Sequence, residues 1–220
     1  LKCVLWLQKV NGQKILKILN KKFIYLISPN KIISSTFYNN LNLVLKSNKV
    51  KFFQLRLKKE RKNRKVIIAK KILRICKKNK VKLIINDDPY LASKVNADGC
   101  HLGQKDMNIK KAKKILKKKI IEITCHNSIK LAKKALLDGA DYIALGAFYK
   151  SKTKKTIYKA HIKTLINIKM STNLPVVAVG GINEKNYKNL LLNKADFLAI
   201  SGYIWNNKKL KPQQAIKNLK

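Results

Sequence analysis

The stretch PVVAVGGINEKNYKNLLLNKADFLAISG, residues 175–202, decides the fold of this chain. It begins with a short apolar, β-branched run typical of a buried strand, and it ends with a second such run, FLAIS (197–201). Between them, KNYKNLLL (185–192) places apolar residues at the three- and four-residue spacing of a helix. Because two strands joined by a helical crossover run in the same direction, the stretch predicts a parallel βαβ unit.

The same alternation recurs outward from this stretch along most of the chain. We predict eight strands, at residues 23–28, 51–57, 81–86, 98–103, 120–124, 142–147, 175–180 and 197–201. Helix starts are expected at polar capping residues, namely Asp88-Pro89, Asn127-Ser128 and Asn183.

Eight such strands close a (β/α)8 barrel. The predicted fold class is therefore an α/β TIM barrel, a single catalytic domain over residues 23–220, with residues 1–22 as an N-terminal helical extension. An open doubly wound sheet is the alternative, but no GxGxxG motif follows the first strand to support it.

The charge of the chain is extreme, because 51 Lys and Arg face only 10 Asp and Glu, a net charge of +41. Such a field attracts nucleic acids and anionic membranes. However, only four of the basic residues are Arg, the side chain that reads bases and grips phosphates bidentately. We therefore interpret most of the Lys as solvated helix faces, and we expect no specific nucleic acid and no membrane as partner.

The cysteines and the start of the chain indicate a cytoplasmic location. Four cysteines are scattered singly, without a CxxC pair or a zinc-finger spacing, and this pattern favours reduced thiols. The opening residues LKCVLWLQK break their apolar run early and show no small-residue cleavage site, so no signal peptide is expected. No apolar run approaches the ~18 residues of a membrane span.

In a barrel of this kind, chemistry lies at the carboxyl ends of the strands. After the second strand, Gln54, Arg56 and Lys58 share one face, while their neighbours face the helices. Two inward cations would be costly to bury without an anion to hold. We expect these three residues to bind an anionic group.

An acidic cluster follows the next two strands. Four of the ten acidic residues fall within the twenty residues from Asp87 to Asp106. Asp87 and Asp106 lie at adjacent strand ends and predict a Mg2+ site that waters and phosphate oxygens complete. Asp88, directly before a proline, is expected to cap a helix instead.

The remaining strand ends carry hydroxyls and glycines. Thr124 and His126 share a face, and a nucleophilic Cys125 beside His126 is disfavoured because neighbours on a strand point to opposite faces. The loop 150–154 could be a simple Lys-rich loop or a lid that binds phosphate. Paired glycines after the seventh strand and Ser201-Gly202 after the eighth favour a phosphate cradle. Without a clear nucleophile or general base, the site points to ionisation of a diphosphate ester and capture of the cation by a second, phosphorylated substrate.

These residues resemble the thiamine phosphate synthase family. The blocks FFQLRLK, LIINDDPYLA with NADGCHLGQKDM, EITCHNS, GADYIALGAFYKSKTKK and LPVVAVGGIN with ADFLAIS follow one another from about residue 23 to the end. The resemblance implies a transferase that joins 4-amino-2-methyl-5-hydroxymethylpyrimidine diphosphate to a thiazole phosphate and releases diphosphate. Small-molecule substrates are thus the expected partners, with a homo-oligomer left open.

The resemblance also implies roles for individual residues. Mg2+ would be held by Asp87 and Asp106, and the pyrimidine diphosphate by Gln54, Arg56, Lys58, Asn86, Thr124 and Lys154. Among these, Arg56, Lys58 and Lys154 would be catalytic. The thiazole phosphate would be bound by Ser151, Thr153, Gly181, Ser201 and Gly202.

Two departures from the family pattern stand out. Lys150-Ser151 replaces the usual Pro-Thr of the lid, and Glu122 replaces a common Gly. Glu122 is expected to point into the barrel and to need a partner such as a Lys. A thiazole tautomerase-like protein of the same fold is one alternative function, although the expected diphosphate and metal residues argue against it. A basic nucleic-acid-binding protein is a second alternative and rests on charge alone.

Overall fold

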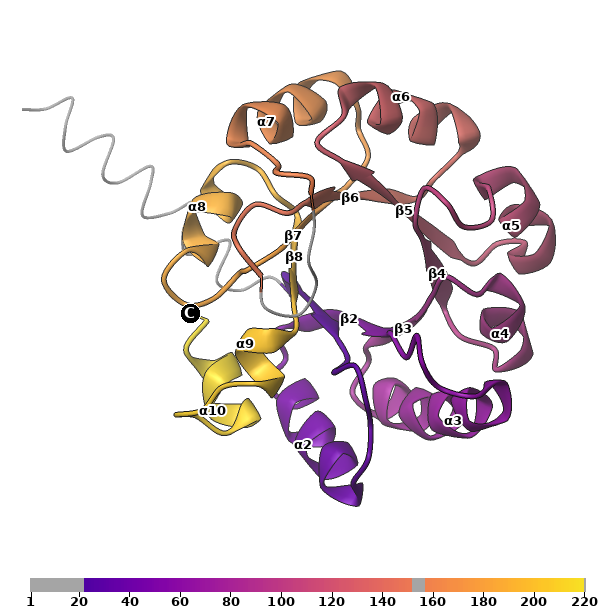
Figure 1. Ribbon diagram of the computed structural model, residues 1–220, viewed down its shortest axis with the longest axis vertical. Coiled ribbons are helices and arrows are strands. Elements are labelled where there is room, and N and C mark those ends of the chain that lie inside the picture. Colours follow the sequence, from indigo (N-terminus) through magenta and orange to yellow (C-terminus); the bar gives the residue numbers. More distant parts are fainter. Residues whose placement is uncertain (1–21, 152–156, 220) are drawn as a thin grey trace, which may run out of the picture.

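Eight parallel strands close into a barrel in the computed structural model, which describes residues 22–151 and 157–219. Figure 1 shows the ring of strands with helices around its outside. Neighbours pair in chain order from β1 to β8, and β8 pairs with β1. The strands are β1 (Ile24–Ile27), β2 (Val50–Leu55), β3 (Lys82–Asn86), β4 (Gly99–Leu102), β5 (Ile120–His126), β6 (Tyr142–Gly146), β7 (Val176–Val179) and β8 (Phe197–Ile200). The predicted TIM barrel and all eight predicted strands are confirmed.

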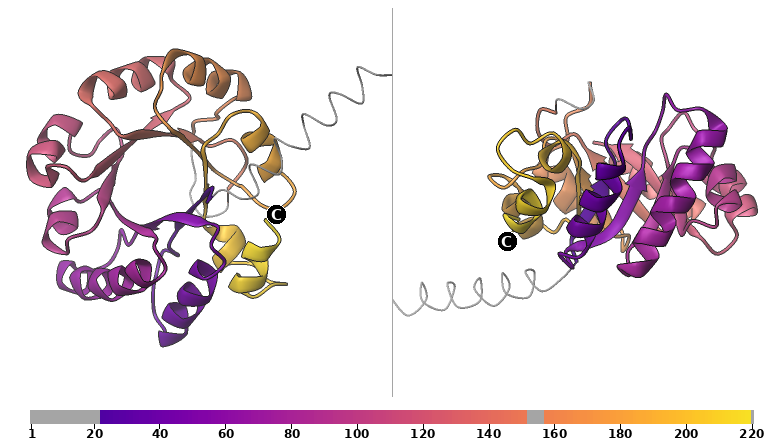
Figure 2. Two further views of the ribbon diagram at one scale, coloured as in Figure 1. Left: turned by 180° about the vertical axis from the view of Figure 1, so that it is seen from behind. Right: turned by 90° about the horizontal axis from the view of Figure 1, so that it is seen from below.

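The helices of the described chain cover the outside of the barrel, as the two views of Figure 2 also show. They are α2 (Ser35–Leu45), α3 (Lys62–Lys78), α4 (Pro89–Lys94), α5 (Ile109–Leu116), α6 (Ile129–Asp138), α7 (Ile162–Ser171), α8 (Tyr187–Leu192), α9 (Gly202–Trp205) and α10 (Pro212–Lys217). None of these helices is both long and apolar enough to cross a membrane. The predicted helix over residues 1–22 lies outside the described residues, except for Lys22.

Two of the three predicted helix starts are confirmed by their caps. Asp88 accepts a hydrogen bond from the Leu91 amide at 2.9 Å, and Ser128 accepts one from the Leu131 amide. The third was wrong, because α8 begins only at Tyr187. Asn183 forms a turn ahead of that helix, in which its side chain accepts a hydrogen bond from the Lys185 amide at 2.9 Å.

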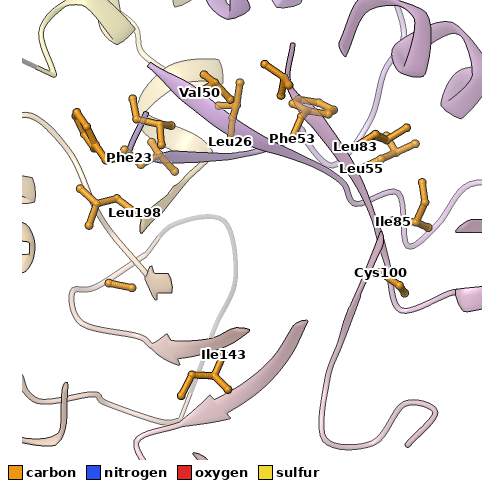
Figure 3. Packing of buried hydrophobic residues seen from close by; sticks show 14 of the residues in the cluster. Phe23, Leu26, Val50, Phe53, Leu55, Leu83, Ile85, Cys100, Ile143 and Leu198 are labelled. Atoms are coloured by element: carbon orange, nitrogen blue, oxygen red, sulfur yellow. The ribbon is translucent and has the colours of Figure 1, made fainter. Parts of the chain in front are cut away.

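The alternation of side chains along each strand builds two apolar layers. Outward-facing residues pack between barrel and helices, and Figure 3 shows several of them at close range, among them Phe53, Leu55 and Leu83. A smaller cluster fills the inside of the barrel and contains Tyr25, Phe52, Ile84, Tyr142, Ala144, Val177 and Ala199. The polar side chains at the strand ends lie next to this inner layer.

Candidate active site

A cavity of about 520 Å³ opens at the carboxyl ends of the strands, and all eight strands contribute to its lining. It brings together every predicted site residue that the structure describes, namely Gln54, Arg56, Lys58, Asn86, Asp87, Asp106, Thr124, Ser151, Gly181, Ser201 and Gly202. Lys150 also lines it. Thr153 and Lys154 lie outside the described residues. Residues far apart in the chain thus meet in one cavity.

The end of β2 supplies a polar wall to this cavity. Gln54 is almost fully buried, and the Arg56 guanidinium donates a hydrogen bond to Asn30 Oδ1 at 2.9 Å. The Arg56 amide donates to Ser28 Oγ at 2.9 Å, which ties the backbone here to the end of β1. Leu55 and Leu57 are buried on the other side, in the outer core. The predicted alternation of faces after β2 is therefore confirmed.

Two carboxylates face this wall from the ends of β3 and β4. The Asp87 side chain lies 3.1 Å from Lys58 Nζ, and Asp87 takes a left-handed backbone conformation with φ of 64°. Its amide donates to the His101 carbonyl at 2.8 Å, which links the two strand ends. Asp106 Oδ2 accepts a hydrogen bond from the Gly103 amide at 2.7 Å. Both acids are thereby held at the same side of the cavity.

The electrostatics of this pair suit a hard cation. Partial burial raises the pKa of Asp106, and the neighbouring Asp87 adds to this, while the Gly103 amide opposes it. When two carboxylates lie close together, each disfavours the negative charge of the other. A divalent cation bound to both would relieve this repulsion, and carboxylate oxygens are ligands that such cations prefer. Among the described residues, no cluster of three or more His, Cys, Asp or Glu could hold a metal. The pair would therefore share an ion with waters and phosphate oxygens.

Glu122 has partners that the sequence did not reveal. It is buried and accepts hydrogen bonds at Oε2 from the Tyr25 hydroxyl at 2.6 Å and from His101 Nδ1 at 2.7 Å. Glu122 thus points inward and has partners, as predicted, but the inward positions of β1 and β4 supply a phenol and an imidazole and not a Lys. Burial lowers the pKa of His101, but the acidic groups of Glu122, Asp87 and Asp106 together raise it more, so the net shift is upward.

The chain of contacts continues to the cavity. His101 Nε2 lies 3.0 Å from Thr124 Oγ1, and both residues line the cavity together with Glu122 and Tyr25. No role was predicted for Tyr25 or His101. The only sequence signal for them was the alternation of faces along a strand. Each lies between two outward-facing apolar neighbours and must therefore point into the barrel.

The end of β5 is irregular. The register shifts between Thr124 and His126, and His126 adopts a φ of 52°. Both residues line the cavity, and the His126 ring stacks on Tyr158 with 3.9 Å between centroids. Cys125 is fully buried in the outer core, where burial raises the pKa of its thiol to about 12. A thiol of that kind is a poor nucleophile, which agrees with the low weight given to Cys125.

Glycines form the opposite side of the cavity, after β7 and β8. Gly180 and Gly181 have φ values of 106° and 63°, a conformation that glycine adopts without strain. A Cβ at Gly181 would lie only 2.4 Å from the Lys150 carbonyl oxygen. The glycine pair is thus needed for the backbone path and for close packing with the loop after β6. Gly202 begins α9 at the neighbouring strand end.

Comparison with known proteins gives a consistent result. The family model described as thiamine monophosphate synthase matches residues 24–204. The chain is 67% identical to a thiamine-phosphate synthase of Pelagibacter ubique, over 92% of this chain and 98% of that protein. It is 34% identical to a thiamine-phosphate synthase of Clostridium acetobutylicum, over 88% of this chain and 92% of the relative. The solved thiamine phosphate pyrophosphorylase of Pyrococcus furiosus is 26% identical, with a TM-score of 0.80, and the match covers 91% of this chain and 94% of that one.

Proposed function

Since the chain belongs to the thiamine monophosphate synthase family, and is thus a transferase that makes thiamine phosphate, we propose that its two substrates bind at two separate groups of strand ends within the cavity. The substrates are 4-amino-2-methyl-5-hydroxymethylpyrimidine diphosphate and a thiazole phosphate. One observation carries the division. The acidic pair with Arg56 and Lys58 lies at one group of strand ends, and the glycines lie at another, within one cavity.

The diphosphate is held at the ends of β2 to β4. Asp87 and Asp106 would hold Mg2+, which when bound would supply positive charge to neutralise the departing diphosphate. Arg56 and Lys58 face the same anion, and Lys154 from the loop after β6 is proposed to join them. These cations bind the diphosphate in the ground state and stabilise the charge that it gains as the ester bond breaks.

The reaction needs no nucleophilic side chain. The bond between the pyrimidine methylene carbon and the diphosphate oxygen breaks, and its electron pair leaves with the diphosphate. The lone pair of the thiazole nitrogen then forms the new carbon–nitrogen bond. Gln54, Asn86 and Thr124 hold the pyrimidine side so that the methylene carbon faces the incoming thiazole.

The thiazole phosphate occupies the glycine side. Gly181, Ser201 and Gly202 line the cavity there, and Ser151 also lines it. Thr153 is proposed to contribute a second hydroxyl. Bare backbone suits this task because phosphate oxygens can approach amides closely where no Cβ intervenes.

The tautomerase-like alternative would use only the glycine side. The paired carboxylates and the salt bridge between Lys58 and Asp87 would then have no task in the cavity. The nucleic-acid alternative requires no cavity at all. We therefore favour the synthase, acting in the cytoplasm, where its three described cysteines, all buried and unpaired, would stay reduced.

Synthesis by the purified chain tests the metal proposal. Thiamine phosphate is measured from both substrates in Mg2+, after EDTA treatment, and after Mg2+ is added back. We expect synthesis to fall to background with EDTA and to return with the metal. Undiminished synthesis in EDTA would overturn the assignment of Mg2+ to Asp87 and Asp106.

A further inference from the structure

A buried chain of polar side chains runs under the cavity and joins three strands. It starts at the Tyr25 hydroxyl on β1, passes through Glu122 on β5 and His101 on β4, and ends at the Thr124 hydroxyl on β5. The three contacts measure 2.6, 2.7 and 3.0 Å between their donor and acceptor atoms. All four residues line the cavity, and the last of them, Thr124, lies where we place the pyrimidine.

Stability alone does not account for this chain. The inside of the barrel is otherwise apolar and aromatic around Tyr25, Phe52, Ile84 and Tyr142. A buried carboxylate costs free energy that its partners offset only when the geometry is good, and well-packed apolar residues often serve as well or better. Glu122 nevertheless lies here with 1% of its surface exposed. A costly group at the floor of a cavity is a candidate for a functional role.

The direction of the hydrogen bonds follows from the carboxylate. A carboxylate can only accept, so both the Tyr25 hydroxyl and His101 Nδ1 must donate to Glu122. Nδ1 therefore carries a proton whatever the charge of the ring, and the ring is held with Nε2 toward Thr124. The Thr124 hydroxyl, engaged by Nε2, loses its freedom to rotate. Glu122 thus sets, through His101, how the Thr124 hydroxyl is oriented toward a ligand.

We propose that Glu122 is a positioning residue for the pyrimidine substrate, and that it acts through His101 on the hydroxyl of Thr124. This inference rests on the proposed placement of the pyrimidine beside Thr124. Among the described residues, no hydrogen bond joins this chain to Gly181, Ser201 or Gly202, where we place the thiazole phosphate. Glu122 should therefore affect the binding of one substrate and not of the other.

A double-mutant cycle tests the proposal. Glu122→Gln keeps the shape of the side chain but replaces the charged oxygen that accepts from both His101 and Tyr25 with a neutral amide oxygen, which is a weaker acceptor. Thr124→Val removes the hydroxyl that receives the effect. We expect each single variant to raise KM for the pyrimidine diphosphate roughly tenfold, and KM for thiazole phosphate less than about twofold. KM of the double variant should be no higher than KM of the more impaired single variant, because both changes interrupt the same chain of hydrogen bonds.

Two further variants guard against a purely structural effect. Tyr25→Phe removes one donor to Glu122 and should raise the same KM about two- to fivefold. Tyr142→Phe is the matched control, because the Tyr142 hydroxyl is buried in the same layer but lies outside the hydrogen-bonded path from Glu122 through His101 to Thr124. It should leave both KM values unchanged. If Glu122→Gln fails to fold, the contrast between these two tyrosines decides: equal effects overturn the proposal.

The possible failures are distinguishable. An unchanged KM in Thr124→Val would overturn the placement of the pyrimidine, and this inference with it. Additive effects of Glu122→Gln and Thr124→Val would overturn the role of Glu122 alone, as would an equal rise in KM for both substrates. Nitrogen NMR of the histidine rings gives a readout independent of turnover. The signal of the hydrogen-bonded Nδ1 proton of His101 should shift in Glu122→Gln, because an amide oxygen is a weaker acceptor than a carboxylate, and it should stay in place in Thr124→Val; an unchanged signal in Glu122→Gln would contradict the proposal.

Discussion

The two sides of the cavity are built from different parts of the chain. At the ends of β2 to β4 the wall consists of side chains, with Lys58 placed 3.1 Å from Asp87 and with Asp106 beside them. At the ends of β7 and β8 it consists of backbone, where Gly180 and Gly181 hold positive φ angles. Charge on the first side can therefore be changed without moving the backbone, whereas on the glycine side binding and folding are coupled.

The largest effect is expected at the two carboxylates of the first side, where we propose the metal. Asp87→Asn or Asp106→Asn should lower turnover about 100- to 1000-fold, because each removes charge from the site that neutralises the leaving diphosphate. Both variants should stay folded, since an amide oxygen can still accept from the Gly103 amide and since the exposed ion pair with Lys58 adds little stability. Steady-state synthesis over a range of Mg2+ concentrations and thermal melting check both points.

Asp88→Asn is the matched control for these variants. Asp88 lies next to Asp87 but caps α4, and asparagine caps a helix about as well as aspartate. It should therefore keep near-normal turnover. Near-normal activity of Asp87→Asn and Asp106→Asn at limiting Mg2+ would refute the metal assignment.

A somewhat smaller effect is expected from the cation on the same side. Arg56→Ala should lower kcat about 30- to 100-fold, because the charge that Arg56 stabilises develops as the ester bond breaks. Binding of thiazole phosphate, measured by calorimetry, should stay unchanged. A variant that makes thiamine phosphate at the normal rate, or that loses thiazole phosphate instead, would break the comparison between the two sides.

The glycine side predicts the reverse pattern. Gly181→Ala forces a φ of 63° on alanine and brings its Cβ against the Lys150 carbonyl, so it should lower the free energy of unfolding by about 1–3 kcal/mol. KM for thiazole phosphate should rise about tenfold, with little change for the pyrimidine diphosphate. Denaturant unfolding and steady-state kinetics measure the two effects. If Gly181→Ala has the same free energy of unfolding as the wild type, the backbone does not require glycine at this position.

The smallest effect concerns the charge spread over the rest of the surface. If the Lys of the helix faces are only solvated, binding to duplex DNA should be weak, blind to sequence and lost steeply as salt rises. Fluorescence anisotropy with two unrelated duplexes at several salt concentrations measures this. Nanomolar, sequence-selective binding at physiological salt would mean that the charge has a task of its own.

The sequence predicted the barrel because each strand carries its own apolar signal. FIYLIS and PVVAVG, for example, match β1 and β7 to within one residue at both ends. The inward residues after β2 followed from strand periodicity alone. The bulge at Cys125 and the late start of α8 did not, because they depend on how neighbouring segments pack rather than on local pattern.

The partners of Glu122 show where sequence reasoning ends for the site. His101 and Tyr25 are separated from Glu122 by 21 and 97 positions in the chain. Their side chains meet only because the barrel closes with a particular register between β1, β4 and β5. Residue types and parity indicate that each side chain points inward, but they do not indicate which ones touch.

The most direct test of the account is whether the two sides bind separate anions at once. Inorganic diphosphate with Mg2+ is titrated calorimetrically into the wild-type chain, and thiazole phosphate is then titrated into the saturated complex. Diphosphate binding should require Mg2+, because we propose that the metal neutralises its charge. Because the two proposed sites lie at different strand ends, thiazole phosphate should bind with the same affinity before and after saturation. Competition between the two anions for one site would contradict the division of the cavity proposed here.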